Sequence, residues 1–189
     1  MKVKDIMKTA LMLSGKNDIL SSSLFDENLT ESEYKEICAA YPDIERLLFA
    51  VNSAISEICA YKRVLTTAEV IESNGTVMYP SLNKKILFPL NVYTNCGFAD
   101  YKAYSDRIET VKGRIRFSYV YMPDKLTFFE EIAFPKYLTE ETVAFLSLFY
   151  FYNGCGLYDN AVRYRRLYYD AALVMPLYRQ YQPMPCMMW

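Results

Sequence analysis

The chain contains no histidine among its 189 residues. Its absence excludes Ser-His-Asp and Cys-His nucleophiles, a histidine general base and the common histidine-bearing zinc sites. The five cysteines are odd in number and no two stand at CxxC spacing, which argues against a disulfide framework and a four-cysteine zinc site. We therefore expect reduced thiols, typical of a cytosolic protein, and neither a metal nor a cofactor.

Glycine is scarce, and long apolar runs and a strong net charge are lacking. The only G-x-G among the six glycines, Gly154-Cys155-Gly156, follows an expected helix and lacks a third glycine. It predicts a helix–helix turn rather than a phosphate-binding loop. The longest apolar segment, residues 143–152, is about half the length that a membrane span needs. With a net charge of −1, no overall field attracts the chain to nucleic acid or membrane. We expect a soluble intracellular protein that is not an enzyme.

The chain is rich in hydrophobic and aromatic residues. Hydrophobic residues make up 52% of the sequence and aromatic residues 16%, with 18 tyrosines and 11 phenylalanines. This is enough for a sizeable core and excludes intrinsic disorder. The charges are uneven, since residues 62–125 carry 10 basic and 6 acidic side chains. This excess favours chance scatter on a solvated surface over an electrostatic binding face.

Helical signals dominate the first third of the chain. Apolar residues recur at helical spacing from Val3 to Leu11, and Gly15 is a natural C-terminal stop. Residues 16–30 are polar and predict a loop. Thr30 and Glu33 form a capping-box pattern that starts a helix, and the proline at position 42 breaks it. A second helix is expected over residues 42–61.

The middle third changes to β-branched and aromatic residues with turn signals between them. Asn74-Gly75 is the strongest hairpin signal, and Lys112-Gly113 predicts a further turn. Residues 114–121 alternate in polarity, which predicts one buried and one wet sheet face. The expected strands are residues 68–72, 77–79, 85–92, 101–104, 107–110 and 114–121.

Two helices and a tail complete the chain. Thr139 is a plausible cap for a buried helix over residues 140–152, and a final helix is expected over residues 157–174. The fold class is α+β: N-terminal helices, a central antiparallel hairpin-rich sheet module, then C-terminal helices and an extended tail. We expect one domain, 1–189, with helical residues 1–61, a β module at 62–125, helical residues 126–175 and a tail at 176–189.

The tail is the candidate partner-binding segment. Its aromatic and methionine side chains would form an exposed apolar patch unless they pack on the chain's own body or on another subunit, and both readings stay open. On the last helix, Arg163 and Arg166 share a face while Arg165 lies elsewhere. This split favours an ordinary exposed face or a subunit contact over nucleic-acid readout. The candidate partner-binding residues are Tyr178, Tyr181, Met184, Met187, Met188 and Trp189.

Four stretches, in order along most of the chain, resemble head–tail connector (adaptor) proteins of tailed phages and Gram-positive prophages. They are IMKTALML at residues 6–13, LLFAVNSAISEI at 47–58, GRIRFSYVYMP at 113–123 and GLYDNA at 156–161. The chain departs from that family in its larger strand region and its Met- and Pro-rich tail.

The resemblance implies a non-enzymatic structural subunit of a phage or prophage particle that forms a homo-oligomeric ring. Its expected partners are further copies of itself and other phage structural proteins such as the portal, with no sequence-specific nucleic acid and no membrane. Its expected location is the bacterial cytoplasm during assembly and then the virion. The alternative is a small intracellular binding or regulatory module that uses the β module as a protein or ligand contact surface.

Overall fold

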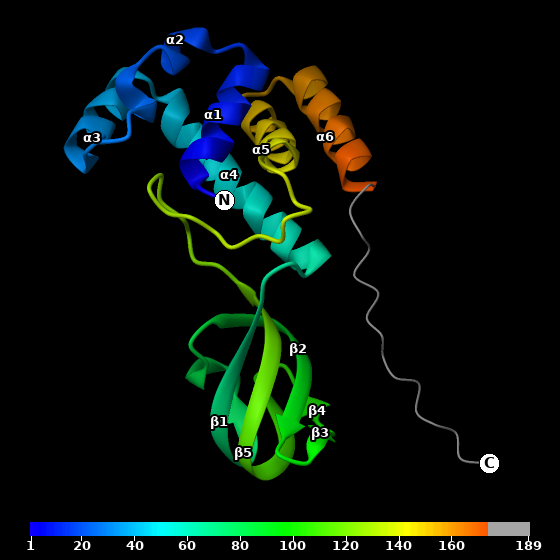
Figure 1. The fold of residues 1–189 in the computed structure, drawn as a ribbon. Helices are drawn as coiled ribbons and strands as arrows, with labels where there is room; N and C mark the ends of the chain where they lie inside the picture. The colour runs from blue at the N-terminus through cyan, green and yellow to red at the C-terminus, as the bar shows by residue number, and fades with distance from the viewer. Residues whose placement is uncertain (174–189) are drawn as a thin grey trace.

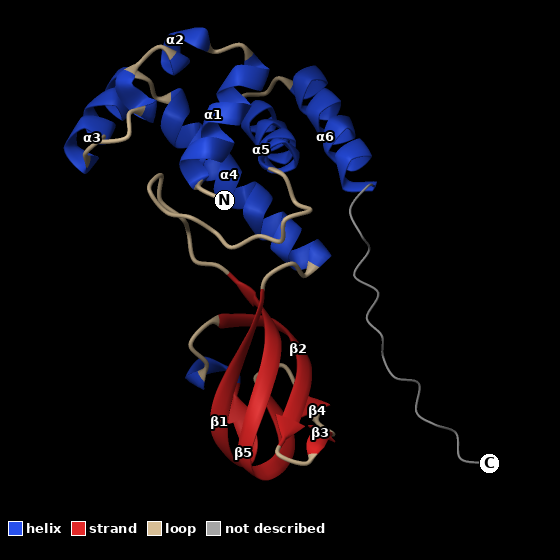
Figure 2. Cartoon of the chain, viewed as in Figure 1, coloured by secondary structure: helices blue, strands red, loops and turns tan. Residues whose placement is uncertain are grey.

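A computed structural model describes residues 1–173, so the predicted tail lies outside the described residues. Helices occur at both ends of the chain and an antiparallel sheet lies between them (Figure 1), which confirms the α+β class. Figure 2 shows the helices and the strands as two lobes of the molecule. The chain passes between the lobes twice, after α4 and after β5. The helices are α1 (Val3–Ser14), α2 (Asn17–Leu20), α3 (Glu31–Ala40), α4 (Asp43–Lys62), α5 (Glu140–Gly154) and α6 (Tyr158–Leu173).

The helix signals of the sequence are confirmed at their predicted ends. Gly15 has φ 71° after α1, a left-handed conformation that glycine adopts readily. Thr30 and Glu33 form both bonds of the capping box at the start of α3. The Thr139 side chain accepts a hydrogen bond from the Thr142 backbone at the start of α5. The loop predicted at residues 16–30 is only partly correct, because it contains the short α2 and a 3-10 turn at Ser23–Phe25.

The sheet consists of β1 (Thr66–Met78), β2 (Lys85–Thr94), β3 (Gly97–Ala99), β4 (Lys102–Ala103) and β5 (Arg107–Met122). Its order is β1-β5-β2-β3, with β4 also paired to β5, and all pairs are antiparallel. The β2–β3 hairpin turns at residues 94–97, where Thr94 pairs with Gly97. A short 3-10 helix, Tyr79–Ser81, connects β1 toward β2.

The hairpin predicted at Asn74-Gly75 and the turn predicted at Lys112-Gly113 are both wrong. The two dipeptides face each other across one long ladder, in which Asn74 pairs with Lys112 of β5. The ladder continues past a register shift to Met78, so each glycine lies inside a strand. Two pairs of short predicted strands are therefore two long strands.

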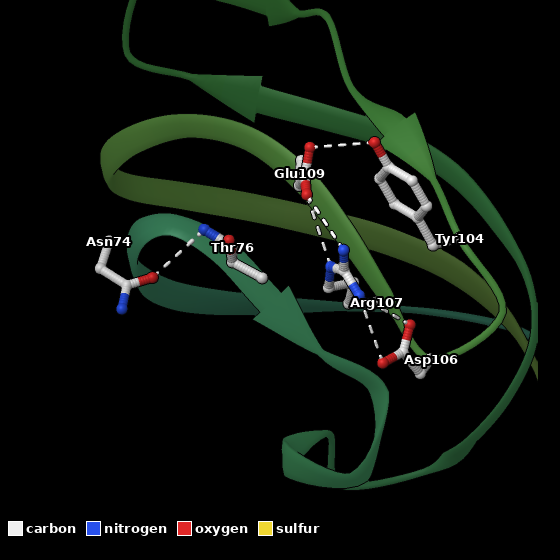
Figure 3. Close-up of polar contacts among 6 residues, drawn as sticks. All are labelled: Asn74, Thr76, Tyr104, Asp106, Arg107 and Glu109. Atoms are coloured by element: carbon white, nitrogen blue, oxygen red, sulfur yellow. Dashed lines mark hydrogen bonds and ion pairs between the residues drawn. The ribbon is translucent and has the colours of Figure 1, made fainter.

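Local geometry explains how these turn signals are used. Gly75 has φ 107° and Gly113 has φ 111°, conformations that favour glycine. The Ser73 hydroxyl accepts from the Gly75 backbone N–H, and Asn74 Oδ1 accepts from the Thr76 backbone N–H at 3.2 Å (Figure 3). These local bonds support a β-bulge, which bends the paired strands without ending them.

The buried side chains form two clusters, one in each lobe. The larger cluster lies between the helices and includes Val3, Ile44 and Val143, each with no exposed surface. The smaller cluster lies on the inner face of the sheet and is formed by Val77, Val92, Ile108, Ile115, Phe117 and Tyr119. The predicted alternation on β5 is confirmed at Ile115, Phe117 and Tyr119, which are buried, whereas Tyr121 on the same predicted face is only half-buried. Val120, which the alternation places on the wet face, is buried as well.

The segment after β5 runs across the helical lobe before α5 begins. Asn52 of α4 holds it: its Oδ1 accepts from the Leu126 N–H at 2.7 Å, and its Nδ2 donates to the Leu126 carbonyl at 2.9 Å. Phe128 is buried and stacks on Tyr34 of α3, with 4.8 Å between ring centroids. Val3 donates its backbone N–H to the Glu130 carbonyl. These contacts join the two helical parts of the chain, which are distant in sequence.

Among residues 1–173, no helix has the length and apolar character needed to cross a bilayer.

Candidate interaction surface

A groove of about 790 Å³ lies where α4, α5 and α6 meet the segment that follows β5. Its floor combines apolar and charged groups, because helix α4 contributes both Ile55 and Glu57. Its lining residues are Phe49, Asn52, Ser53, Ile55, Ser56, Glu57, Tyr61, Pro123, Asp124, Lys125, Phe149, Tyr150 and Arg165.

An ion pair between α4 and α6 lies in the groove. Arg165 Nη2 is 2.8 Å from Glu57 Oε1, and Nη1 donates to Oε2 at 2.9 Å. This two-point geometry suits the planar guanidinium. The Glu57 side chain is only 11% exposed and that of Arg165 25%, so removing either partner would leave a poorly hydrated charge. The hydrogen bond to Glu57 raises the pKa of Arg165, which stays protonated.

Tyr150 of α5 extends this network by donating its hydroxyl proton to Glu57 Oε2. Burial, and then this hydrogen bond, raise the pKa of Tyr150 to about 12. The hydroxyl is therefore neutral at physiological pH and acts as a donor to the carboxylate. Neither Tyr150 nor Arg165 is poised for proton transfer near neutral pH.

Aromatic rings surround the Arg165 guanidinium. Its central carbon lies 4.7 Å from the centroid of Phe149 and 4.9 Å from that of Tyr169. Its Nε also donates to the Tyr169 hydroxyl at 3.1 Å. These cation–π contacts fix the guanidinium plane. The groove thus has a rigid polar centre that packs against aromatic rings.

Exposed apolar side chains lie on two of the helices that form the groove. On α4, Phe49 is 68% exposed and Tyr61 is 79% exposed. On α6, Tyr158, Val162 and Tyr169 are each more than half exposed. With Arg165 between them they stand at steps of four, three and four residues, which places them on one helix face. We call these five side chains and the groove between them the apolar surface.

The sequence prediction located partner binding elsewhere. All six predicted residues, from Tyr178 to Trp189, lie outside the described residues, so that prediction is untested. The predicted split of the arginines is confirmed, because Arg163 and Arg166 are exposed while Arg165 is partly buried against Glu57.

Sequence reasoning missed Glu57 and Tyr150. Glu57 is 108 residues from Arg165 and 93 from Tyr150, so no local spacing links them. One weak signal existed, an acidic residue on the otherwise largely apolar stretch from Leu47 to Ile58.

The thiols are free within the described residues. Cys38 and Cys59 are buried, while Cys96 and Cys155 are exposed. Both exposed cysteines lie in turns, which carry little covering structure. Residues 1–173 hold no cluster of three or more His, Cys, Asp or Glu side chains suited to a metal ion.

No protein-family model matches the chain, and no curated protein matches it significantly. A functional proposal therefore depends on the chain's own residues and on the geometry of its surfaces.

Proposed function

We propose that the chain is a non-enzymatic structural subunit of a phage or prophage particle, a head–tail connector that assembles into a ring through contacts with further copies of itself. The observation that carries this proposal is the apolar surface. Aromatic residues and arginine are enriched where protein surfaces meet, and four exposed aromatic rings lie on the two helices that hold Glu57 and Arg165.

The polar centre of the groove supports a protein contact. Arg165 and Glu57 neutralise each other, so a partner that covers them does not bury a net charge. The exposed rings of Phe49 and Tyr61 present large areas with few rotatable bonds, a property of interface anchor residues.

The resemblance to connector proteins supports the same proposal. Two of its four stretches contribute to the apolar surface: residues 47–58 supply Phe49 and Glu57, and residues 156–161 supply Tyr158. In a ring, this surface on one subunit would meet a different surface of the next.

The first test measures mass in solution. Light scattering or native mass spectrometry of the full chain, alone and with a portal protein of the same particle, should detect a closed oligomer in at least one condition. A strictly monomeric chain that ignores the portal would refute the proposal. A chain that lacks residues 176–189 tests the predicted tail contact, and reduced assembly with an unchanged melting temperature is the expected result.

Charged substitutions test the apolar surface itself. Phe49→Asp and Val162→Asp place a carboxylate where a subunit contact is expected, so assembly should weaken while the fold persists, because both side chains are exposed. Val111→Asp is the matched control, since Val111 is 42% exposed on the sheet. Equal assembly of all three variants would show that this surface is not an interface.

The alternative function, a binding module that uses the sheet, is favoured by a different observation. Within residues 1–173, β1 is paired only with β5, so its other edge can accept a further strand. A bound extended peptide would protect β1 amides from hydrogen exchange. Exchange that is unchanged by peptides selected for binding would remove this alternative.

A further inference from the structure

The outer face of the sheet, which points away from the smaller buried cluster, carries a row of basic side chains on β5. Lys112, Arg114 and Arg116 occupy alternate positions in an unbroken register with β1, and all three are exposed. Alternate strand residues are about 7 Å apart, so the row is about 14 Å long. Ile115 and Phe117, between and beside them, point into the core.

Within residues 1–173, the three basic side chains of this row outnumber the single carboxylate that faces them, that of Glu72. Neither Lys112, Arg114 nor Arg116 forms an ion pair there, although Glu72 faces Arg114 in the register. The row therefore keeps positive charge available for an anion.

Three other acidic side chains of the sheet, Asp106, Glu109 and Glu69, are paired elsewhere. Figure 3 shows Arg107 between two of them, with Nη1 3.3 Å from Asp106 and Nη2 3.3 Å from Glu109. The Tyr104 hydroxyl also donates to Glu109 at 3.1 Å. On the inner face, Glu69 accepts a hydrogen bond from the Tyr119 hydroxyl.

A groove and aromatic rings adjoin the basic row. The groove, of about 640 Å³, is lined by Arg114, Arg116 and Tyr93 among others. Tyr93 is paired with Arg116 across β2 and β5 and with Phe98 across the β2–β3 hairpin. The Phe98 ring is 72% exposed and lies 4.5 Å, centroid to centroid, from that of Tyr93. Arginines and an accessible aromatic ring thus share one sheet face.

We propose that this face binds single-stranded nucleic acid without sequence preference. Lys112, Arg114 and Arg116 contact successive phosphates, and bases stack on Phe98 and Tyr93. This pairing of a basic track with exposed rings is how sheets hold single strands. A duplex offers phosphates but keeps its base faces stacked, and an acidic peptide offers carboxylates but no planar base, so neither uses the exposed ring.

Fluorescence anisotropy of a labelled oligothymidine with the full chain tests the proposal. Each phosphate contact contributes about −0.7 to the slope of log K against log salt for single strands, so three contacts give about −2. Arg114→Gln/Arg116→Gln should reduce the slope to about −0.7. Arg114→Lys/Arg116→Lys keeps the positive charge and should therefore keep the slope. This variant distinguishes a loss of charge from a loss of the fold as the cause of any reduced slope.

Phe98→Ala tests stacking. It should weaken oligothymidine binding about 5- to 150-fold without changing the salt slope. Phe129→Ala, in the helical lobe, is the control for loss of an exposed ring, and Arg163→Gln/Arg166→Gln on α6 is the control for loss of two exposed charges. Both controls should bind like the parent chain.

Three results would overturn the proposal. The first is no binding at low salt. The second is binding that neither the Arg114/Arg116 pair nor Phe98 affects. The third is duplex DNA or polyglutamate competing as well as oligothymidine, which would assign the face to duplexes or to acidic peptides. The face lies on the other lobe from the apolar surface, so its failure and the failure of ring assembly are separately measurable.

Discussion

Replacing Arg165 with methionine should destabilise the protein, because it leaves the Glu57 carboxylate without its cation. Breaking one side of a fully buried pair costs about 3–5 kcal/mol, and here the two side chains keep 25% and 11% of their exposure. Tyr150 still donates a hydrogen bond to Glu57. We therefore expect a loss of about 2–3 kcal/mol in the free energy of unfolding, or roughly 5–10 °C in melting temperature for a chain of this size.

Urea unfolding of four chains measures this loss: parent, Arg165→Met, Glu57→Met and the double variant. Removing both charges leaves no charge unpaired, although the Tyr150 hydroxyl loses its acceptor. The double variant should therefore cost less than the sum of the single variants by about 1–3 kcal/mol. Arg166→Met is the control, since Arg166 is exposed, and its effect should stay within about 0.5 kcal/mol. The reasoning would be refuted if the losses in unfolding free energy of the two single variants simply added up in the double variant. A loss in unfolding free energy below about 0.5 kcal/mol for Arg165→Met would refute it as well.

Three further predictions concern other parts of the fold. Asn52→Ala removes both hydrogen bonds to the segment after β5 and should cost about 1–3 kcal/mol in urea unfolding, while the exposed Asn160→Ala should change little. Gly113→Ala should cost about 1–3 kcal/mol in the free energy of unfolding, because φ 111° strains a residue with an L side chain. Gly154→Ala is the control and should be neutral or stabilising, because the space around its Cβ position is open. Thermal unfolding compares the two variants. The raised pKa of Tyr150, about 12 in the fold against about 10 unfolded, means that its contribution to stability is full below pH 10 and is lost as pH rises toward 12. Tyr150→Phe should flatten this alkaline decline, and an unchanged decline would show that other tyrosines account for it.

Helix ends were predictable because their causes are local. The capping box of Thr30 and Glu33 is completed within four residues, and Gly15 supplies its own left-handed conformation. Local signals gave the wrong prediction at Asn74-Gly75. The short-range hydrogen bonds typical of a turn are present there, but they stabilise a β-bulge within a long strand and not a hairpin. A hairpin and a bulge share such dipeptides, and the choice depends on which strand lies opposite.

The candidate surfaces were less predictable than the fold. The excess of basic residues in the middle third was visible, but it favoured chance scatter over a binding face. The row at Lys112, Arg114 and Arg116 became apparent only from the sheet register. The pair of Glu57 and Arg165 depends on how α4 packs against α6, and no pattern in either helix specifies that.

The sequence alone determined the absence of histidine chemistry, the α+β class and most helix boundaries. A residue type that is missing from the chain cannot be supplied by folding, and helix caps depend on residues within one turn of each other. Tertiary structure decided that two apparent hairpins are one long bent ladder, since pairing along β5 satisfies more backbone groups than two short strands folded back on themselves. It also decided which of the many aromatic side chains are core and which face water. Periodicity shows which residues share a face, but only packing shows whether another element covers that face.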